Sequence, residues 1–236
     1  PANLFRVFCS ELTFRTCDAN SETKGTYMKV LNTIAILLIG AAVATAGEWQ
    51  PLFDGTSLTG WKASEKPGVF SIIDADTLKV EGGRSHLFWM GTDTIPATFT
   101  DFEFSAKVKT TPSANGGIFF HTEYQETGWP KKGYEAQVNS THKDKRKTAS
   151  IYAVQDVMNE APSTDGEWFN YLIRVEGKTV TISVDGEVVN EYTEPADLNP
   201  QERFKDRRLS SGTFAIQGHD PKSTTYYRNI KVRTLK

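Results

Sequence analysis

The sequence predicts an all-β fold, a one-domain antiparallel β-sandwich or jelly roll. Apolar and polar residues alternate in many short segments, as expected when the side chains along a strand point to opposite faces. Turn residues separate these segments, and no long stretch has the periodicity of an amphipathic helix. The sequence contains neither a repeat of fixed period nor a linker that would divide the domain, which favours two packed sheets in one unit.

A secretory signal peptide is predicted over residues 28–46. Met28 and Lys29 precede the apolar run Ile34–Gly40, and Ala44–Ala46 form a small-residue cleavage site. A membrane anchor would need about 20 apolar residues, and this run is shorter. We therefore expect an exported protein, in the periplasm or outside the cell, with no membrane association after cleavage.

Residues 1–27 precede this signal and begin with Pro rather than Met. They contain both cysteines, Cys9 and Cys17. We interpret them as a disordered artefact of a start site placed too far upstream. The folded domain is then predicted to span residues 47–236, without disulfides, and to depend on a packed core.

Charge gives no sign of a polyanionic partner. The chain has 27 Lys and Arg against 29 Asp and Glu, a formal net charge of −2. Neither nucleic acid nor an anionic membrane is expected from this balance. The basic cluster Lys143–Lys147 is interrupted by Asp144 and is interpreted as a solvated loop. The oligomeric state is left open.

Strands are predicted in chain order from the alternation. The segments are 70–72, 78–80, 102–108, 118–121, 134–138, 171–175, 180–184, 214–216 and 230–232. Asp165-Gly166 and Asp185-Gly186 predict hairpins, because Asp and Gly tolerate positive φ. The aromatic residues of the opening segment 49–61 are expected in the core, and residues 195–205 could form a short helix.

One predicted strand carries a polar row. Glu135, Gln137 and Asn139 alternate with Tyr134, Ala136 and Val138, so one face can join the core while the other presents a carboxylate and two amides. If this segment pairs with residues 115–122 across the short loop between them, His121 could lie near Glu135. Such a row suits sugar binding or acid–base chemistry.

Several blocks of the sequence resemble the 3-keto-disaccharide hydrolase family. In order they are Trp49–Trp61, Asn115–His121, Gly133–Gln137, Ser150–Tyr152, Gly166–Asn170, Gly212–Gln217 with His219, and Tyr227–Lys231. The resemblance implies a jelly roll of the concanavalin-A-like (lectin and glucanase) type. It also implies cleavage of glycosides whose sugar carries a ketone at C3. His121 stands where the family usually has Arg.

A ketone at C3 acidifies the hydrogen on C2, so one base could start an elimination that expels the glycosidic oxygen. Glu135 is the candidate base, and His121 or His219 could protonate the leaving oxygen. Arg228 and Asn229 could hold hydroxyls or the ketone oxygen. The other residues expected to contact substrate are Asn115, Trp129, Tyr134, Gln137, Asn139 and Gln217.

No cofactor is expected, although a divalent metal is an alternative. His121, Glu135 and His219 could assemble one, but the sequence has no closely spaced ligand motif of the His-Glu-x-x-His type. A non-catalytic carbohydrate-binding module is the main alternative function, because fold does not determine function. In that case Trp89, Trp129 and Tyr124 could stack on sugars. A structural protein of a cell-surface assembly is a third alternative.

Overall fold

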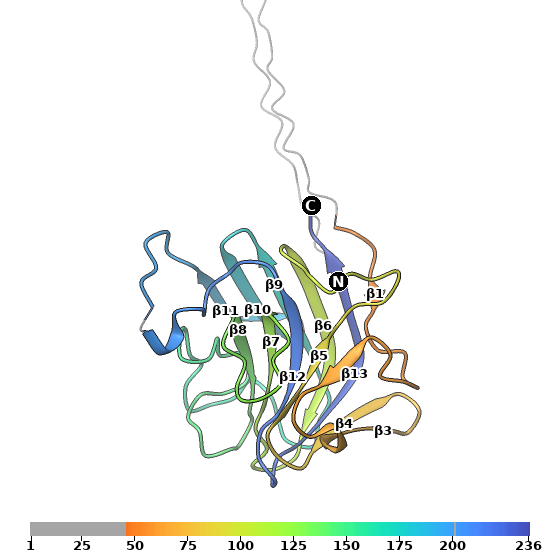
Figure 1. Ribbon diagram of the computed structural model, residues 1–236. Helices are drawn as coiled ribbons and strands as arrows, with labels where there is room; N and C mark the ends of the chain where they lie inside the picture. The colour runs from red at the N-terminus through yellow and green to blue at the C-terminus, as the bar shows by residue number, and fades with distance from the viewer. Residues whose placement is uncertain (1–45, 201) are drawn as a thin grey trace, which may run out of the picture. The chain divides into compact units, whose positions relative to one another are not determined.

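Two antiparallel β-sheets pack face to face in the part of the chain that the structure describes (Figure 1). The structure is a computed structural model, and it describes residues 46–200 and 202–236. The predicted signal peptide, apart from its last residue, and the segment before it lie outside the described residues. Among the described residues, no helix is long and apolar enough to cross a membrane.

The larger sheet has eight strands in the order β11-β10-β9-β6-β13-β4-β3, with β1 paired to β13. Its strands are β1 (Gln50–Pro51), β3 (Phe70–Ile73), β4 (Thr77–Glu81), β6 (Phe102–Thr110), β9 (Phe169–Glu176), β10 (Thr179–Val184), β11 (Glu187–Thr193) and β13 (Thr224–Thr234). The smaller sheet has the order β2-β5-β12-β7-β8. Its strands are β2 (Trp61–Ala63), β5 (Ser85–Trp89), β7 (Gly116–Thr122), β8 (Tyr134–Val138) and β12 (Thr213–Gly218).

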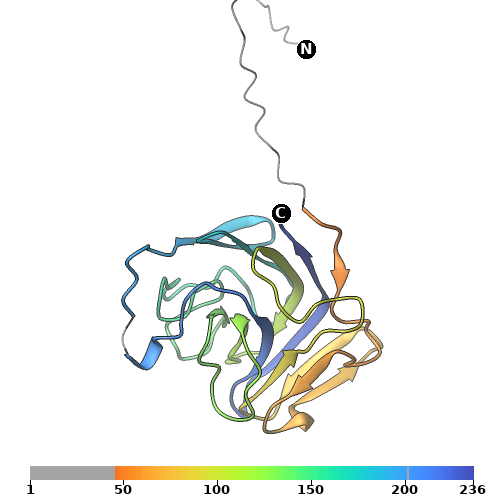
Figure 2. The same cartoon turned by 45° about the horizontal axis from the view of Figure 1, so that its top comes forward.

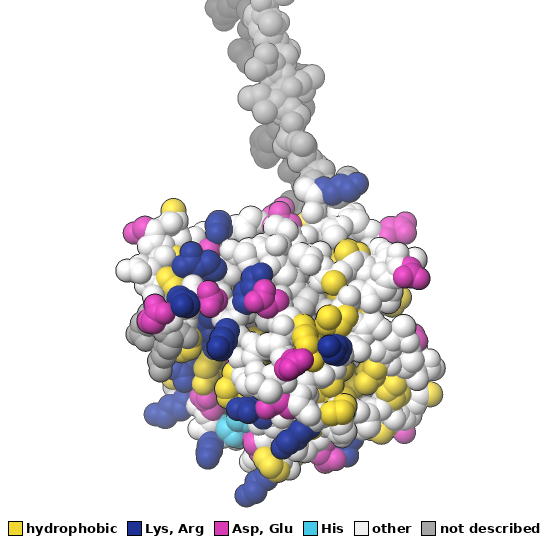
Figure 3. Space-filling view, viewed as in Figure 1, with side chains coloured by type: hydrophobic (Ala, Val, Ile, Leu, Met, Phe, Trp, Pro, Cys, Tyr) yellow, Lys and Arg dark blue, Asp and Glu magenta, His cyan; other side chains and the backbone are white. Residues whose placement is uncertain are grey.

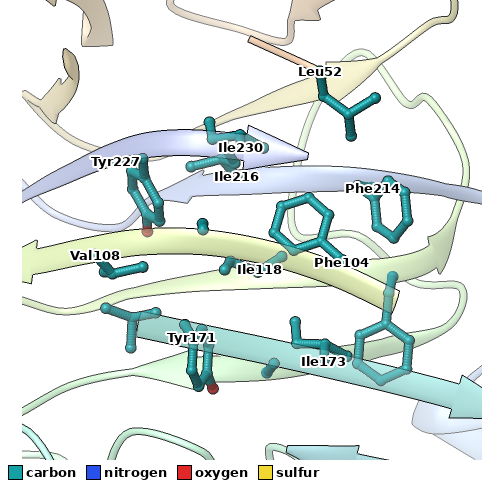
Figure 4. Packing of buried hydrophobic residues seen from close by; sticks show 14 of the residues in the cluster. Leu52, Phe104, Val108, Ile118, Tyr171, Ile173, Phe214, Ile216, Tyr227 and Ile230 are labelled. Atoms are coloured by element: carbon teal, nitrogen blue, oxygen red, sulfur yellow. The ribbon is translucent and has the colours of Figure 1, made fainter. Parts of the chain in front are cut away.

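The hydrophobic core fills the space between the two sheets. Alternate residues of β6 point into it, and the ring of Phe104 meets the ring of Phe214 from β12 at a centroid distance of 4.8 Å. Figure 4 shows these rings together with Ile118, Ile173 and other apolar side chains from both sheets. A smaller apolar cluster of Phe88, Phe119 and Ala215 lies apart from this core.

The predicted all-β sandwich is confirmed, and every predicted strand segment falls within an observed strand. The alternation did not predict β1, β2, β5 or β11. In β5 every residue is buried and the apolar residues Leu87, Phe88 and Trp89 are consecutive, so the alternation that marks a half-buried strand is missing. The strand β11 is charged and mostly exposed, as edge strands often are.

Two turn predictions have different outcomes. Asp185 and Gly186 both have positive φ and join β10 to β11, so this hairpin is confirmed. The hairpin prediction at Asp165-Gly166 is wrong, because these residues belong to a long loop that precedes β9. The predicted helix over 195–205 is limited to one 3-10 turn, η2 (Glu202–Phe204).

Two side-chain predictions need correction. Phe53 is buried and Trp61 packs against the core as expected, but Trp49 instead lies beneath the cationic groups of Lys231 and Arg233. Lys147 is not solvated. Its side chain is buried, and its ammonium group donates to the carbonyl oxygen of His142 at 2.7 Å.

A β-bulge interrupts β7 near its end. Thr122 pairs with Thr213 and Phe119 with Ala215, so two residues of β7 oppose a single residue of β12. His121 is one of those two residues and has a φ of 55°. Beyond Phe119, the side chains of β7 therefore no longer follow the regular alternation between the two faces of the sheet.

The bulge requires glycine beside it. A Cβ at Gly133 would lie 2.0 Å from the carbonyl oxygen of Phe120. Gly133→Ala is therefore expected to destabilise the fold by more than the roughly 1–2 kcal/mol that positive φ alone costs an L-residue. Chemical denaturation measures this cost.

Gly166→Ala is the matched control, because Gly166 also has positive φ but its Cβ would meet no atom within 4 Å. Equal losses of stability in the two variants would contradict the steric account.

Candidate functional site

A polar row crosses the smaller sheet on the face away from the core. Gln137 of β8 lies opposite Gly117 of β7, and Glu135 lies opposite Phe119. On the other side of β7, the register of β12 brings Gln217 beside Gly117. The pairing of β7 with β8 that the sequence predicts is thereby confirmed, and it places a glycine between two glutamines.

Gly117 leaves room for the carboxylate of Glu135. A Cβ at Gly117 would lie 2.5 Å from Glu135 Oε1, so any other residue would displace this group. The same oxygen accepts a hydrogen bond of 2.7 Å from Gln217 Nε2. The carboxylate therefore reaches across β7 and is held by an amide from β12.

A cavity of about 530 Å³ opens over this row, within the range typical of small-molecule sites. Its lining is Asn115, Phe119, Trp129, Pro130, Lys131, Glu135, Gln137, Tyr152, Phe204, Arg207, Gln217 and His219. Phe204 and Arg207 come from the segment around η2, which lies on the β8 side of the sheet in both views (Figures 1 and 2). A larger hollow of about 620 Å³ lies between residues 123–132 and 206–210, but its acidic side chains are exposed.

Glu135 combines burial with chemical access to the cavity. Its side chain is 6 % exposed. Burial raises its pKa from the ordinary 4.5 to about 7, against the opposing effects of the Arg207 charge and the hydrogen bond from Gln217. Near neutral pH this carboxyl group can therefore both take up and release a proton, as a general base requires.

The two glutamines present acceptor oxygens. Gln137 Nε2 donates to Asn115 Oδ1 at 3.0 Å, while Gln217 Nε2 is occupied by Glu135. The side-chain oxygens of both glutamines are buried and have no hydrogen-bond partner among the described residues. Because an unpaired buried acceptor costs free energy, a ligand whose hydroxyl groups donate to these oxygens would be favoured.

Asp220 orients His219 at another wall of the cavity. His219 Nδ1 lies 2.9 Å from Asp220 Oδ2. Burial works against ionisation of Asp220, but hydrogen bonds from Ser223 and His219 outweigh it and lower the pKa to about 2. The ionised carboxylate accepts a hydrogen bond from Nδ1–H, which leaves Nε2 of His219 for proton exchange.

The metal trio considered from the sequence is not assembled, because His121 lies outside the cavity. Within the described ranges, ligand atoms of His142, His219 and Asp220 do lie within 4.8 Å of one another. However, the backbone N–H of Asp144 donates to His142 Nδ1 at 3.2 Å, so the neutral ring carries its proton on Nε2. That proton blocks the nitrogen that faces Asp220, and these residues fit a hydrogen-bonded cluster better than a cation site.

Six of the predicted site residues line the cavity together: Asn115, Trp129, Glu135, Gln137, Gln217 and His219. Trp129 belongs to the loop between β7 and β8 and is 42 % exposed. Its ring lies 5.3 Å from that of His219. The surface in Figure 3 intersperses Lys and Arg with Asp and Glu, in keeping with the balanced composition.

The expectation that His121 joins Glu135 is wrong. His121 is buried, and its ring packs edge-on against Phe102. Its Nε2 pairs with the carbonyl oxygen of Thr100 at 2.8 Å, and its Nδ1 accepts from the backbone N–H of Ser210 at 3.2 Å. The β-bulge causes this, since it removes His121 from the face that Phe119 occupies.

Two further predicted contacts serve the fold instead. Tyr134 points into the core, where its hydroxyl donates to Glu194 at 2.8 Å. Asn139 bridges the following loop, with Nδ2 donating to the carbonyl oxygens of Asp144 and Arg146. Neither residue lines the cavity.

Arg228 and Asn229 lie on β13, in the other sheet, and are not brought to the cavity. The guanidinium group of Arg228 bonds to Thr77 Oγ1 at 2.6 Å and to Asp76 at 3.1 Å. It also lies over the ring of Trp168. Asn229 has a φ of 50° within an irregular part of β13. Their predicted substrate contacts are therefore corrected.

Several lining residues were missed from the sequence. Phe204 comes from the segment 195–205 that could have been a helix, and Arg207 lies two residues beyond it; neither stands in a periodic pattern. Tyr152 belongs to one of the family-like blocks and could have been selected on that basis. Asp220 directly follows His219 in the sequence. It could have been predicted as the partner of that histidine, because an acidic residue beside a candidate catalytic histidine is visible in the sequence.

A family model and several solved structures match the chain. The family model described as the 3-keto-alpha-glucoside-1,2-lyase-like domain matches residues 48–233. No curated protein matches the sequence. A crystal structure of a protein from Parabacteroides distasonis ATCC 8503, provisionally classed as a glycosyl hydrolase, has a TM-score of 0.67 at 21% identity. That comparison covers 80% of this chain and 94% of the other.

Other similar structures span binding modules and enzymes. The carbohydrate-binding module CBM66 from Bacillus subtilis has a TM-score of 0.52 at 16% identity, covering 74% of this chain and 96% of its own. The β-glucanase of Bacillus licheniformis has a TM-score of 0.51 at 11% identity, and the comparison covers 81% of this chain and 99% of the glucanase chain. At these identities the similarity establishes the shared jelly-roll fold.

The burial of Glu135 predicts a pH-dependent stability. Between its ordinary pKa of 4.5 and about 7 the folded state binds more protons than the unfolded state, so stability falls as the pH rises through this range. Glu135→Gln has no carboxyl group at this position, so its free energy of unfolding does not fall in this way. The free energy of unfolding of the variant minus that of wild type is therefore expected to be larger at pH 8 than at pH 4, by up to about 3 kcal/mol.

Urea denaturation at both pH values measures the difference. Glu187→Gln on β11 is the control, because Glu187 is exposed and outside the cavity. A stability difference between Glu135→Gln and wild type that does not change with pH would contradict the burial account.

Proposed function

The chain belongs to the 3-keto-alpha-glucoside-1,2-lyase-like family, and on that premise we propose that it cleaves glycosides whose sugar carries a ketone at C3. The observation that carries the proposal is the buried carboxyl group of Glu135, with its pKa near 7, in a cavity lined by amide, aromatic and basic side chains. This arrangement supports proton abstraction next to a carbonyl group better than direct displacement, which in most glycosidases uses a pair of carboxylates.

In the first step Glu135 removes the proton from C2. The ketone at C3 takes up the electron pair of the broken C2–H bond as an enolate. Arg207 and Lys131 line the same cavity, and their positive charge favours the enolate. Gln137 accepts a hydrogen bond from a hydroxyl of this sugar through its unpaired oxygen. These contacts hold C2 against the carboxylate.

In the second step the enolate returns its electron pair to form the C1–C2 double bond, and the bond from C1 to the glycosidic oxygen breaks. The doubly protonated ring of His219 gives the proton on Nε2 to the departing oxygen, while Nδ1–H stays bonded to Asp220. Water then adds across the double bond, with hydrogen on C2 and hydroxyl on C1. The proposal uses no metal ion.

We further propose that the domain works outside the cytoplasm, in the periplasm or beyond the cell. The basis is the signal peptide predicted over residues 28–46.

A non-catalytic carbohydrate-binding module is the second candidate function. The partly exposed Trp129 beside the cavity favours it, since an indole ring can stack on the apolar face of a sugar. The two candidates differ in what Glu135 does. In a binding module its carboxylate contributes only a hydrogen-bond acceptor, and no bond of the ligand is broken.

Turnover of 3-keto-glycosides separates the two. The purified 47–236 fragment is expected to cleave members of a panel of 3-keto-disaccharides. Glu135→Gln should lower the rate by at least about 10²-fold, the typical contribution of a general base, while binding by calorimetry persists. Glu187→Gln should retain the wild-type rate, and so should wild type treated with chelator.

Binding of 3-keto-disaccharides and of ordinary glycans without any cleavage would contradict the enzyme proposal and favour the binding module.

The pH profile supplies an independent measurement. Because only the ionised form of Glu135 can accept the C2 proton, kcat/KM is expected to rise about tenfold per pH unit on the acid side of pH 7. A rate that is already constant from pH 5 upward would contradict the raised pKa of the base.

A further inference from the structure

His86 of β5 is a buried histidine that the proposed mechanism does not use. Its side chain is 0 % exposed. Neither ring nitrogen has a hydrogen-bond partner among the described residues. Burial lowers its pKa to about 3, so the ring is neutral at ordinary pH and offers one N–H donor and one nitrogen acceptor. Leaving both unpaired opposes folding, and a ligand that pairs them would recover this loss.

His86 extends the polar row of the cavity by one strand. It lies opposite Gln217 in the pairing of β5 with β12. The side-chain oxygen of Gln217 is itself buried and unpaired among the described residues. Three unpaired polar atoms thus lie on the neighbouring strands β5 and β12, with Gln217 in the cavity lining and His86 just beyond it.

Trp129 covers His86. The two rings lie 5.5 Å apart at an interplanar angle of 76°, and Trp129 also contacts His219 and the guanidinium group of Arg84. Within the described part of the chain, the indole is held by these ring contacts and by no hydrogen bond of its own. Since Trp129 is already 42 % exposed, its ring can turn toward solvent without breaking a hydrogen bond.

The loop that carries Trp129 is stabilised by hydrogen bonds between its own residues. Gln125 donates to the carbonyl oxygens of Thr127 and Trp129, and accepts from the backbone N–H of Lys131. Hydrogen bonds to the rest of the domain lie away from the indole: from Glu65 N–H to the Glu126 carbonyl oxygen, from Gly133 N–H to the Asp206 carbonyl oxygen, and from the backbone of Gly128 to Glu65. The side chain of Trp129 can therefore move while the loop keeps its internal hydrogen bonds.

We propose that Trp129 covers a second sugar subsite, in which His86 and Gln217 bind the hydroxyl groups of the substrate's other pyranose ring. When Trp129 turns aside, the donor and acceptor of His86 and the oxygen of Gln217 become available to vicinal hydroxyls. The indole then forms a wall on which the sugar ring stacks. This inference rests on the proposed function, since it assigns the place of the second ring of a disaccharide.

Ring-nitrogen NMR of the histidines tests the subsite directly, because the chain has only four histidines. The Glu135→Gln variant binds without turnover and is titrated with two probes. These are the 3-keto derivative of maltose, with two rings, and methyl 3-keto-α-glucoside, with one. With the two-ring probe the resonances of both His219 and His86 are expected to shift, and with the one-ring probe only those of His219.

The outcomes separate the two proposals. A shift at His219 without one at His86 under the two-ring probe would overturn the subsite and leave the proposed function standing. No shift at either histidine with either probe would overturn both.

Two variants test the same subsite by other readouts. His86→Phe keeps a ring and removes the unpaired nitrogens. It should raise KM for 3-keto-maltose about tenfold, the effect of losing one or two hydrogen bonds, with little change for the one-ring substrate and no loss of Tm. A change equal for both substrates would overturn the subsite.

Trp129→Ala should let His86 titrate near the ordinary histidine pKa by NMR, because water then reaches the ring. Trp168→Ala, just before β9 of the other sheet, is the control and should leave His86 unchanged. If His86 stays untitrated in Trp129→Ala, Trp129 is not the cover and the proposal fails.

Discussion

The carboxylate of Glu135 occupies the space that any side chain at position 117 would need, and this steric constraint organises the whole site. Gly117 lets the group cross β7, and Gln217 meets it from β12 at 2.7 Å. Removal from water then raises the pKa of the carboxyl group to about 7. The sheet thus holds a carboxyl group whose pKa lies close to neutral pH. Burial of this ionisable group lowers the stability of the fold, and such losses of stability are expected at functional sites.

The sandwich could be predicted because most of its strands bury one face only. In β6, apolar side chains point to the core while polar ones point outward, and this period of two is visible in the amino-acid sequence. In β5 both faces are covered, one by the core and one by Trp129 and its neighbours, so the pattern disappears. The β-bulge in β7 could not be read from periodicity, because it depends on the close approach of Gly133 and Gly212 to the strand.

The same limits explain which site residues could be found. Glu135 and Gln137 follow from alternation in β8, and Gln217 and His219 from the blocks that resemble the family. His121 was misplaced by the bulge. Arg228 was misplaced because the order of blocks along the chain does not say which sheet a strand joins. Arg207 reaches the cavity from an irregular segment, and such segments carry functional side chains without a local pattern that reveals them.

The central claim is that cleavage begins with removal of the C2 proton by Glu135. The most direct measurement is the fate of that hydrogen when wild-type protein cleaves a 3-keto-disaccharide in D₂O, followed by NMR of the released sugar. Elimination and hydration predict that the product has lost the original hydrogen on C2 and carries deuterium there. With Glu135→Gln we expect neither cleavage nor exchange of that hydrogen. A wild-type product that keeps its original hydrogen on C2 would show direct displacement at C1 and would contradict the account.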